Sequence, residues 1–174
     1  CEPAEPEPAA LVVVLDRSGS MGETAQGNLT KLDFARDAVT QGVLPWLDFA
    51  RGDRLGLLVF NDSVTELLAL ATVPSPDAVA RAVGGVSAFG KTELYAPLAR
   101  AAAMLETVES NHKKILVLSD GKSTVATKVE DEFRALGEKC RAAKIDVAVV
   151  TPGQAEPPPE LRALSAKIYQ GTYE

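Results

Sequence analysis

Residues 11–21 read LVVVLDRSGSM, and the prediction of the fold class rests mainly on this segment. Its first five residues are apolar and lack polar alternation, which is typical of a strand buried on both faces of a sheet. Oxygen-bearing side chains then follow at every second position, in Asp16, Ser18 and Ser20. Such side chains point the same way in an extended backbone, so the three can converge where the strand ends. A small divalent cation prefers hard oxygen donors of this kind.

These residue types also have an ordinary structural use, because Asp and Ser are common in turns after strands and at helix N-termini. Two later segments favour the cation-binding interpretation. Residues 115–121 read ILVLSDG, so a second apolar run ends in Asp120. Residues 90–93 read GKTE and place Thr92 in a polar loop, where it is a candidate ligand, a helix N-cap, or both. Parallel strands end at one edge of a sheet, where ligands bind, so Asp16 and Asp120 would face each other if their strands are neighbours.

The rest of the chain alternates strand patterns with helix patterns. The expected strands are residues 11–15, 54–60, 64–70, 115–118, 145–150 and 167–169, and the expected helices start near residues 30, 76, 94, 127 and 160. The short turn at residues 61–63 makes the second and third strands antiparallel. We therefore expect an α/β fold: a Rossmann-like, doubly wound, mostly parallel six-stranded sheet with one antiparallel edge strand and helices on both faces.

The first helix carries the clearest local signals. Residues 30–33 resemble a capping box in which Asp33 takes the place of the usual Glu. Apolar residues then recur at helical spacing, so Trp46 and Leu47 are expected in or near the core. Pro45 has no backbone donor and should kink or end the regular part of the helix.

The three polar segments together resemble the von Willebrand factor type A family. The residues that carry the resemblance are, in family order, Asp16, Ser18, Ser20, Thr92, Ser119, Asp120 and Gly121. The resemblance covers roughly residues 10–173 and implies a metal-ion-dependent adhesion site, usually for Mg²⁺, with Mn²⁺ or Ca²⁺ as alternatives. By that resemblance the first four residues contact the ion directly or through water, and Asp120 acts through a water. The family usually adds a helix after the last strand, and none is encoded here.

A site of this composition has little negative charge to neutralise a dication, since Asp16 and Asp120 are its only carboxylates. A bound ion would keep positive character and an open coordination position, because Mg²⁺ favours six ligands and retains water. We therefore expect Mg²⁺-dependent binding of a partner protein that contributes an Asp or Glu side chain. The family resemblance also leaves open an adaptor or regulatory subunit of a ring-shaped AAA-type ATPase or chelatase complex.

An enzyme is the third interpretation, because haloacid-dehalogenase-like phosphatases also present an Asp nucleophile at a strand end. Those enzymes need an acid or a Thr two residues later, where this chain has Ser18. A base-assisted serine mechanism needs a histidine, and the only one, His112, is expected at the surface at the far end of its strand. We therefore expect no catalytic activity.

Composition limits the class of protein further. The chain has 174 residues, of which 46% are hydrophobic, and this is typical of one globular domain. Its formal net charge of −6 argues against nucleic acid as a partner. No apolar run approaches the length that spans a membrane.

The amino-terminal segment differs in composition from the domain at residues 10–174. Residues 1–9 are rich in Pro and Glu and are expected to form a flexible tether. A first-position cysteine before such a tether is what a processed, lipid-anchored bacterial protein shows, and an arbitrary start of the numbering is the alternative. An anchor at Cys1 would place the domain at the cell surface or in the periplasm, which we slightly favour over the cytoplasm. Cys140 lies on an apolar helical stripe, so a buried free thiol is expected rather than a disulfide with Cys1.

Overall fold

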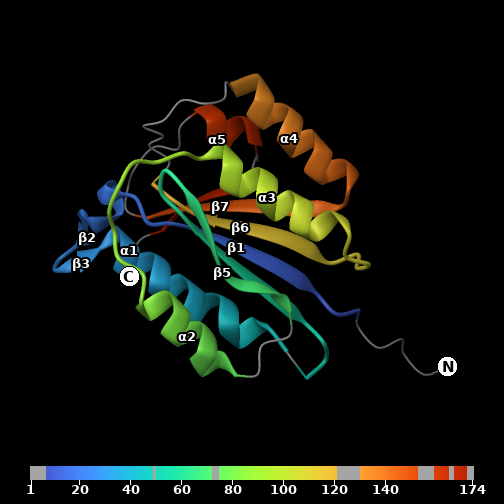
Figure 1. Cartoon of the computed structure of the whole chain (residues 1–174), viewed down its shortest axis with the longest axis horizontal. Helices are drawn as coiled ribbons and strands as arrows, with labels where there is room; N and C mark the ends of the chain where they lie inside the picture. Colours follow the sequence, from blue (N-terminus) through green and yellow to red (C-terminus); the bar gives the residue numbers. More distant parts are fainter. Residues whose placement is uncertain are drawn as a thin grey trace.

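A six-stranded sheet forms the centre of the computed structural model, which describes residues 7–48, 50–71, 75–120, 130–152, 159–164 and 167–171. Its strands are β1 (Ala10–Asp16), β4 (Arg54–Phe60), β5 (Val64–Ala71), β6 (Lys113–Leu118), β7 (Ile145–Pro152) and β8 (Lys167–Gly171). The strand order is β5-β4-β1-β6-β7-β8 (Figure 1). Five of these strands are parallel, and β5 runs antiparallel to β4 at one edge. The predicted fold class is confirmed.

Helices cover both faces of the sheet (Figure 1). The α-helices are α1 (Lys31–Asp37), α2 (Pro76–Gly84), α3 (Tyr95–Glu106), α4 (Glu130–Ala142) and α5 (Pro159–Leu164). Apolar residues of α1 and α2 pack in one core cluster, and those of α3, α4 and α5 pack in the other. The helix expected near residue 76 is α2, which has Ser75 at its N-cap and Pro76 at its first position.

The central strand β1 joins the two core clusters. Val12 and Val14 belong to the cluster under α3 and α4, whereas Val13 and Leu15 belong to the cluster under α1 and α2. These four side chains are completely buried, which explains why the strand shows no polar alternation. Burial of each such side chain favours folding by about 1.5–3 kcal/mol, so β1 is firmly held up to its last residue, Asp16.

The register of the sheet decides which polar residues meet. β1 lies between β4 and β6 and is parallel to both. Leu15 is paired with Leu118, so Asp16 at the end of β1 lies beside Ser119 and Asp120, which follow β6. The two strands are therefore neighbours, which is the condition under which Asp16 and Asp120 were expected to face each other.

The helical segment after the first strand differs from the regular helix that the sequence predicts. Its start is as expected, since the Thr30 hydroxyl accepts the N–H of Asp33 at 3.1 Å and the Asp33 carboxylate accepts the N–H of Thr30 at 2.9 Å. The α-helical part, however, ends at Asp37 and continues as a π-helix, η2 (Ala38–Val43), and a 3₁₀ turn, η3 (Leu44–Trp46). Pro45 thus lies in a 3₁₀ turn beyond the regular helix.

The prediction that Trp46 lies in the core is wrong, because its side chain is 84% exposed. A π turn holds more residues than an α turn, so six residues in this conformation rotate the following side chains away from the apolar stripe. Leu47 is half-buried against the core and agrees with the expectation. Trp46 instead lines a cavity of about 490 Å³ with Leu47, Lys113 and Lys144, at the amino end of the sheet.

A small antiparallel ribbon was not predicted. It consists of β2 (Thr24–Gln26) and β3 (Leu29–Thr30), which follow a 3₁₀ turn, η1 (Gly19–Gly22). Strands of two or three residues are too short to show a period of two in the sequence. The ribbon leads the chain from the end of β1 into the capping box of α1, and therefore places Glu23 beside the start of that helix.

The remaining predictions concern cysteine, histidine and the membrane. Cys140 is a free thiol with 2% exposure, as predicted, whereas Cys1 lies outside the described residues. His112 is exposed at the amino end of β6, also as predicted. Across the part of the chain that the structure describes, no helix combines the length and the apolarity needed to cross a bilayer.

Candidate metal centre

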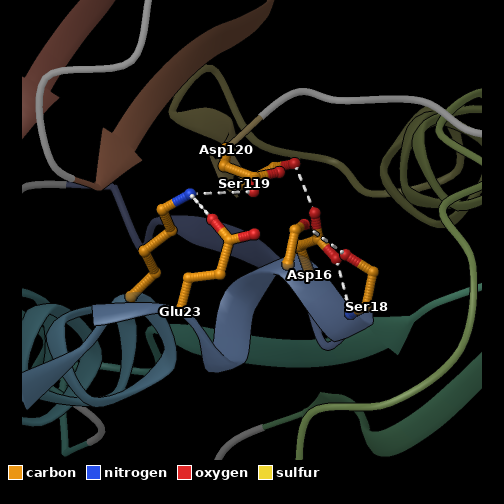
Figure 2. Close-up of polar contacts among 7 residues, drawn as sticks. Asp16, Ser18, Glu23, Ser119 and Asp120 are labelled. Carbon is orange, nitrogen blue, oxygen red and sulfur yellow. Dashed lines mark hydrogen bonds and ion pairs between the residues drawn. The ribbon is translucent and has the colours of Figure 1, made fainter. Parts of the chain in front are cut away.

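Asp16 is the centre of the candidate site and lies at the carboxyl end of β1 with 0% exposure. Its Oδ1 accepts the backbone N–H of Ser18 at 2.8 Å, and its Oδ2 accepts the hydroxyl of Ser119 at 2.7 Å (Figure 2). The hydroxyl oxygens of Ser18 and Ser20 are 3.2 Å apart. The chain therefore brings Asp16, Ser18 and Ser20 together as the alternating pattern predicted.

The loop that carries Thr92 is hydrogen-bonded to the turn at residues 17–19. The N–H of Gly19 donates to the carbonyl of Gly90 at 2.9 Å, and the N–H of Phe89 donates to the carbonyl of Arg17 at 2.8 Å. Gly90 has φ of +84°, and a Cβ there would lie 3.0 Å from Asn61 Nδ2, so the loop requires glycine. Thr92 follows two residues later and is buried.

The first turn of α3 is capped by the side chain of Glu93, the residue after Thr92. The carboxylate of Glu93 accepts the N–H groups of Tyr95 and Ala96, at 3.3 and 2.9 Å, and so satisfies the first turn of α3. The N-cap position of α3 is taken by Leu94, so Thr92 lies two residues before the cap.

Asp120 approaches the site from the end of β6 and is also buried. Its Oδ2 lies 3.3 Å from the ammonium nitrogen of Lys31, which in turn lies 3.1 Å from Glu23 Oε2 (Figure 2). Burial opposes the charged form of Lys31, but the carboxylates of Glu23 and Asp120 outweigh it and raise the pKa of the ammonium. Lys31 is therefore a charged group inside the site.

The two buried carboxylates have unequal surroundings. Burial raises the pKa of Asp16 to about 6, against hydrogen bonds from Ser18 and Ser119, and the charge of Asp120 adds to the increase. Within the described part of the chain, no Lys, Arg or His side chain pairs with Asp16. The neighbouring Arg17 turns away, since its guanidinium lies 4.3 Å from the centroid of the Phe89 ring and donates to the Ser87 carbonyl at 3.1 Å.

The donor set fits a small, hard divalent cation. It offers carboxylate and hydroxyl oxygens, which Mg²⁺, Mn²⁺ and Ca²⁺ prefer, and no thiol or imidazole. Among the described residues, no group of three or more His, Cys, Asp or Glu side chains could hold a metal ion. An ion at this edge therefore needs the hydroxyls of Ser18, Ser20 and Thr92 in addition to the carboxylates. Gly121, the last residue of the motif, lies outside the described residues.

Sequence reasoning missed three members of this cluster. The sequence pattern indicates Ser119 only through the motif and Lys31 only through the capping box, and it gives no indication of Glu23. One signal for Lys31 was present, because the positive end of a helix dipole disfavours a cation in the first turn. A lysine at that position indicates that acidic groups elsewhere in the fold hold it.

A model of the von Willebrand factor type A domain matches residues 11–122 of the chain. The match includes both strand ends of the site and the loop of Thr92. The chain belongs to the von Willebrand factor type A family. Comparison with curated protein sequences gives no match.

Solved structures show that the fold is that of a von Willebrand factor type A domain. One from Catenulispora acidiphila is 23% identical with a TM-score of 0.72, over 91% of this chain and 36% of that chain. BatB from Bacteroides thetaiotaomicron is 15% identical with a TM-score of 0.72, over 94% of this chain and 90% of that one. Proximal thread matrix protein 1 from the mussel byssus, solved with a zinc-occupied adhesion-site motif, is 16% identical with a TM-score of 0.73, over 95% and 44% of the two chains.

Von Willebrand factor type A domains are in general non-enzymatic modules that bind proteins, and they bind a divalent metal at the adhesion-site motif. In this von Willebrand factor type A domain the only histidine, His112, lies at the opposite end of β6 from the candidate metal centre. The expected distance between His112 and Asp16 is thus confirmed.

Proposed function

We propose that this domain binds a partner protein through a divalent cation, preferably Mg²⁺, held at the carboxyl edge of its sheet. Asp16, Ser18, Ser20 and Thr92 would hold the ion directly or through water, and Asp120 through a water. When bound, the ion offers a Lewis-acidic coordination position that suits a carboxylate oxygen of a partner Asp or Glu. The domain itself supplies the position and the surroundings of that carboxylate, and no catalysis.

The observation that carries this proposal is the buried carboxylate of Asp16, beside which the described residues place no cationic side chain. A buried charge is costly unless it is paired or coordinates a metal. The hydroxyls of Ser18 and Ser119 reduce this cost only in part, because the pKa of Asp16 is still raised to about 6. A cation at the oxygen cluster would supply the missing charge.

Selectivity for the partner would come from the side chains around this edge. Arg17 and Phe89 stack across the two loops of the site, and Phe89 is 54% exposed. Lys91 is also exposed in the same loop. An aromatic ring and two cationic side chains beside the ion suit an acidic partner surface, because complementary charge favours association.

Thermal unfolding in MgCl₂ and in EDTA tests the metal site directly. A ligand specific to the folded state stabilises it by about 2.7 kcal/mol when its concentration is one hundredfold above Kd. We expect Mg²⁺ to raise the melting temperature of the wild type, and Asp16→Asn to abolish this increase while the domain still folds. Asp62→Asn is the matched control, because Asp62 is an exposed turn residue near the same edge.

Pull-down with the immobilised domain tests partner binding. Proteins retained in MgCl₂ should be released by EDTA and should not bind the Asp16→Asn variant. Retention that survives both EDTA and Asp16→Asn would overturn metal-dependent binding. Hydrolysis of p-nitrophenyl phosphate that requires Mg²⁺ and is lost in Asp16→Asn would overturn the assignment as a non-enzymatic module.

A further inference from the structure

Lys31 is a buried cation within the metal centre, and neither the motif nor the proposed ligand set accounts for it. We propose that Lys31 sets the charge of the site, so that the site holds a divalent ion less tightly and an acidic ligand more tightly. This inference rests on the proposed function, because it concerns the same site.

Several contacts fix the position of Lys31. It is the first residue of α1, directly after the capping box residue Thr30, and its backbone N–H donates to the Glu23 carbonyl at 2.9 Å. Its side chain reaches Glu23 and Asp120, and the whole residue is only 8% exposed. The ammonium is therefore a buried group with fixed contacts in the site and not a mobile charge at the surface.

Counting charges shows the effect on the site. Asp16 and Asp120 together carry −2, so a dication alone would bring the cluster to zero. The ammonium of Lys31 then brings it to +1. Glu23 offsets this only partly, because its side chain is 60% exposed and its charge is screened by water. With an ion in place, the buried part of the site that the structure describes would therefore carry a net positive charge.

The sign of each effect follows from the position of the ammonium behind Asp120. Acidic groups behind a group that holds a metal ion increase its basicity, so a cation there has the opposite effect. Lys31 would therefore make Asp120 a weaker acceptor for the water through which Asp120 holds the ion. Like charges also repel the incoming dication in a site that is poorly screened. The same positive charge attracts the carboxylate of a ligand. Lys31 thus lowers the affinity of the site for the ion and raises its affinity for the acidic ligand.

The alternative is that Lys31 only supports the local structure. In that case its removal would disorder Asp120 and weaken the binding of both ion and acid. The two explanations therefore predict opposite changes in ion affinity, and one variant distinguishes them.

The test measures two affinities for the wild type and for Lys31→Met, which keeps the length of the side chain without its charge. Titration calorimetry with MgCl₂ and MnCl₂ gives ion affinity, for which we expect binding about tenfold tighter in the variant. Water-proton relaxation of the Mn²⁺-loaded protein, titrated with sodium acetate, gives the affinity for a carboxylate, for which we expect a loss of at least about threefold.

Three further variants serve as controls. Lys31→Arg keeps the charge and should stay within about twofold of the wild type in both affinities. Glu23→Gln removes the partial compensation, so it should shift both affinities in the direction opposite to Lys31→Met. Lys114→Met removes the same charge from an exposed position at the amino end of β6 and should change neither.

The outcomes separate this inference from the proposed function. If the wild type binds Mg²⁺ and Lys31→Met binds it equally or more weakly, the role of Lys31 is overturned and the metal site stands. If only Lys31→Met binds Mg²⁺, Lys31 excludes the ion and the proposed function fails for the wild type. If neither protein binds Mg²⁺ or Mn²⁺, both proposals fail. Far-UV circular dichroism confirms that each variant is folded.

Discussion

Asp53 shows how a single buried carboxylate can be fully satisfied, at the end of the sheet opposite the candidate metal centre. Its oxygens accept the N–H groups of Ala9 and Asp48, both at 2.9 Å, and two guanidinium N–H groups of Arg51, at 3.1 and 2.6 Å. It thereby ties the residue before β1 to the loop before β4. Asp16 differs, because no cationic side chain of the described residues contacts it, and this contrast supports a ligand role for Asp16.

Replacement of Asp53 should destabilise the domain in a pH-dependent way. Burial alone would raise the pKa of Asp53, but the hydrogen bonds from Arg51, Asp48 and Ala9 outweigh it and lower the pKa. The stabilisation is therefore present above the unfolded pKa of about 4 and is lost as the pH falls through the lower, folded pKa. Asp53→Asn should cost about 2 kcal/mol at pH 7 in urea unfolding, with a smaller difference at pH 3.

Glu109→Gln provides the control, because Glu109 is exposed. Its unfolding free energy should match that of the wild type at both pH values. A cost of Asp53→Asn that is the same at pH 7 and pH 3 would contradict the role of the charge.

For individual residues, the candidate metal centre was predictable where the chain carries a motif. Asp16, Ser18 and Ser20 are close in sequence, and their spacing alone predicts that they converge. Lys31 reaches Asp120 across 89 positions of the chain, and Glu23 reaches Lys31 only because a ribbon turns the backbone. Such contacts depend on three-dimensional packing and leave no local pattern.

At the scale of elements, the helix after the first strand shows the limit of periodicity. The apolar spacing predicted the face of α1 correctly, because Leu32 and Ala35 are buried. Beyond Asp37 the winding changes, and the N–H of Leu44 donates to the Val39 carbonyl five residues before it. The sequence gives no sign of this change, so the face assigned to Trp46 was wrong.

The packing of α5 on α4 depends on one glycine. A Cβ at Gly137 in α4 would collide with the backbone carbonyl oxygen of Leu164 at the end of α5. Gly137→Ala favours the helix by up to about 1 kcal/mol but forces the two helices apart, at a cost of about 1–3 kcal/mol. We expect a net loss of stability of about 1 kcal/mol in urea unfolding.

Gly42→Ala is the comparison for this prediction. Gly42 lies in η2, and a Cβ there meets no atom within 4 Å. This substitution should therefore leave stability unchanged or raise it by up to about 1 kcal/mol. Equal stability of Gly137→Ala and Gly42→Ala would show that the contact with Leu164 is easily relieved.

For the whole molecule, the sequence was sufficient to predict the fold class and the antiparallel edge strand, but the prediction did not include the strand order. Apolar runs such as those of β1 and β6 are long and uninterrupted, and helices of the right period separate them. Right-handed crossovers then leave few arrangements, and the observed strand order is one of them. Parallel strands also bring distant residues to one edge, so the fold itself explains why Asp16 and Asp120 lie in the same site.

Cys140 should report the opening of the whole domain. It lies on α4 in the core cluster under α3, and burial raises the pKa of its thiol, with Glu106 adding to the increase. Both effects keep the thiol unreactive while the domain is folded. In a Cys1→Ser background, DTNB should react with Cys140 at least about a thousandfold more slowly than with the chain in 6 M guanidinium chloride.

The dependence of this rate on denaturant is the decisive measurement. The rate should rise with guanidinium chloride in parallel with global unfolding followed by circular dichroism. A fast reaction of Cys140 with DTNB in buffer, or a rate that does not depend on the denaturant concentration, would show that α4 opens separately from the sheet.

The exposed position of Trp46 has a practical consequence for spectroscopy. It is the only tryptophan of the chain, so its indole dominates the ultraviolet emission. Because this indole already faces water, its emission maximum should lie at long wavelength and should change little when the protein is denatured. Fluorescence would therefore be a poor monitor of folding here. A shift of the emission maximum to shorter wavelength would instead report a molecule that binds over Trp46 at the amino end of the sheet.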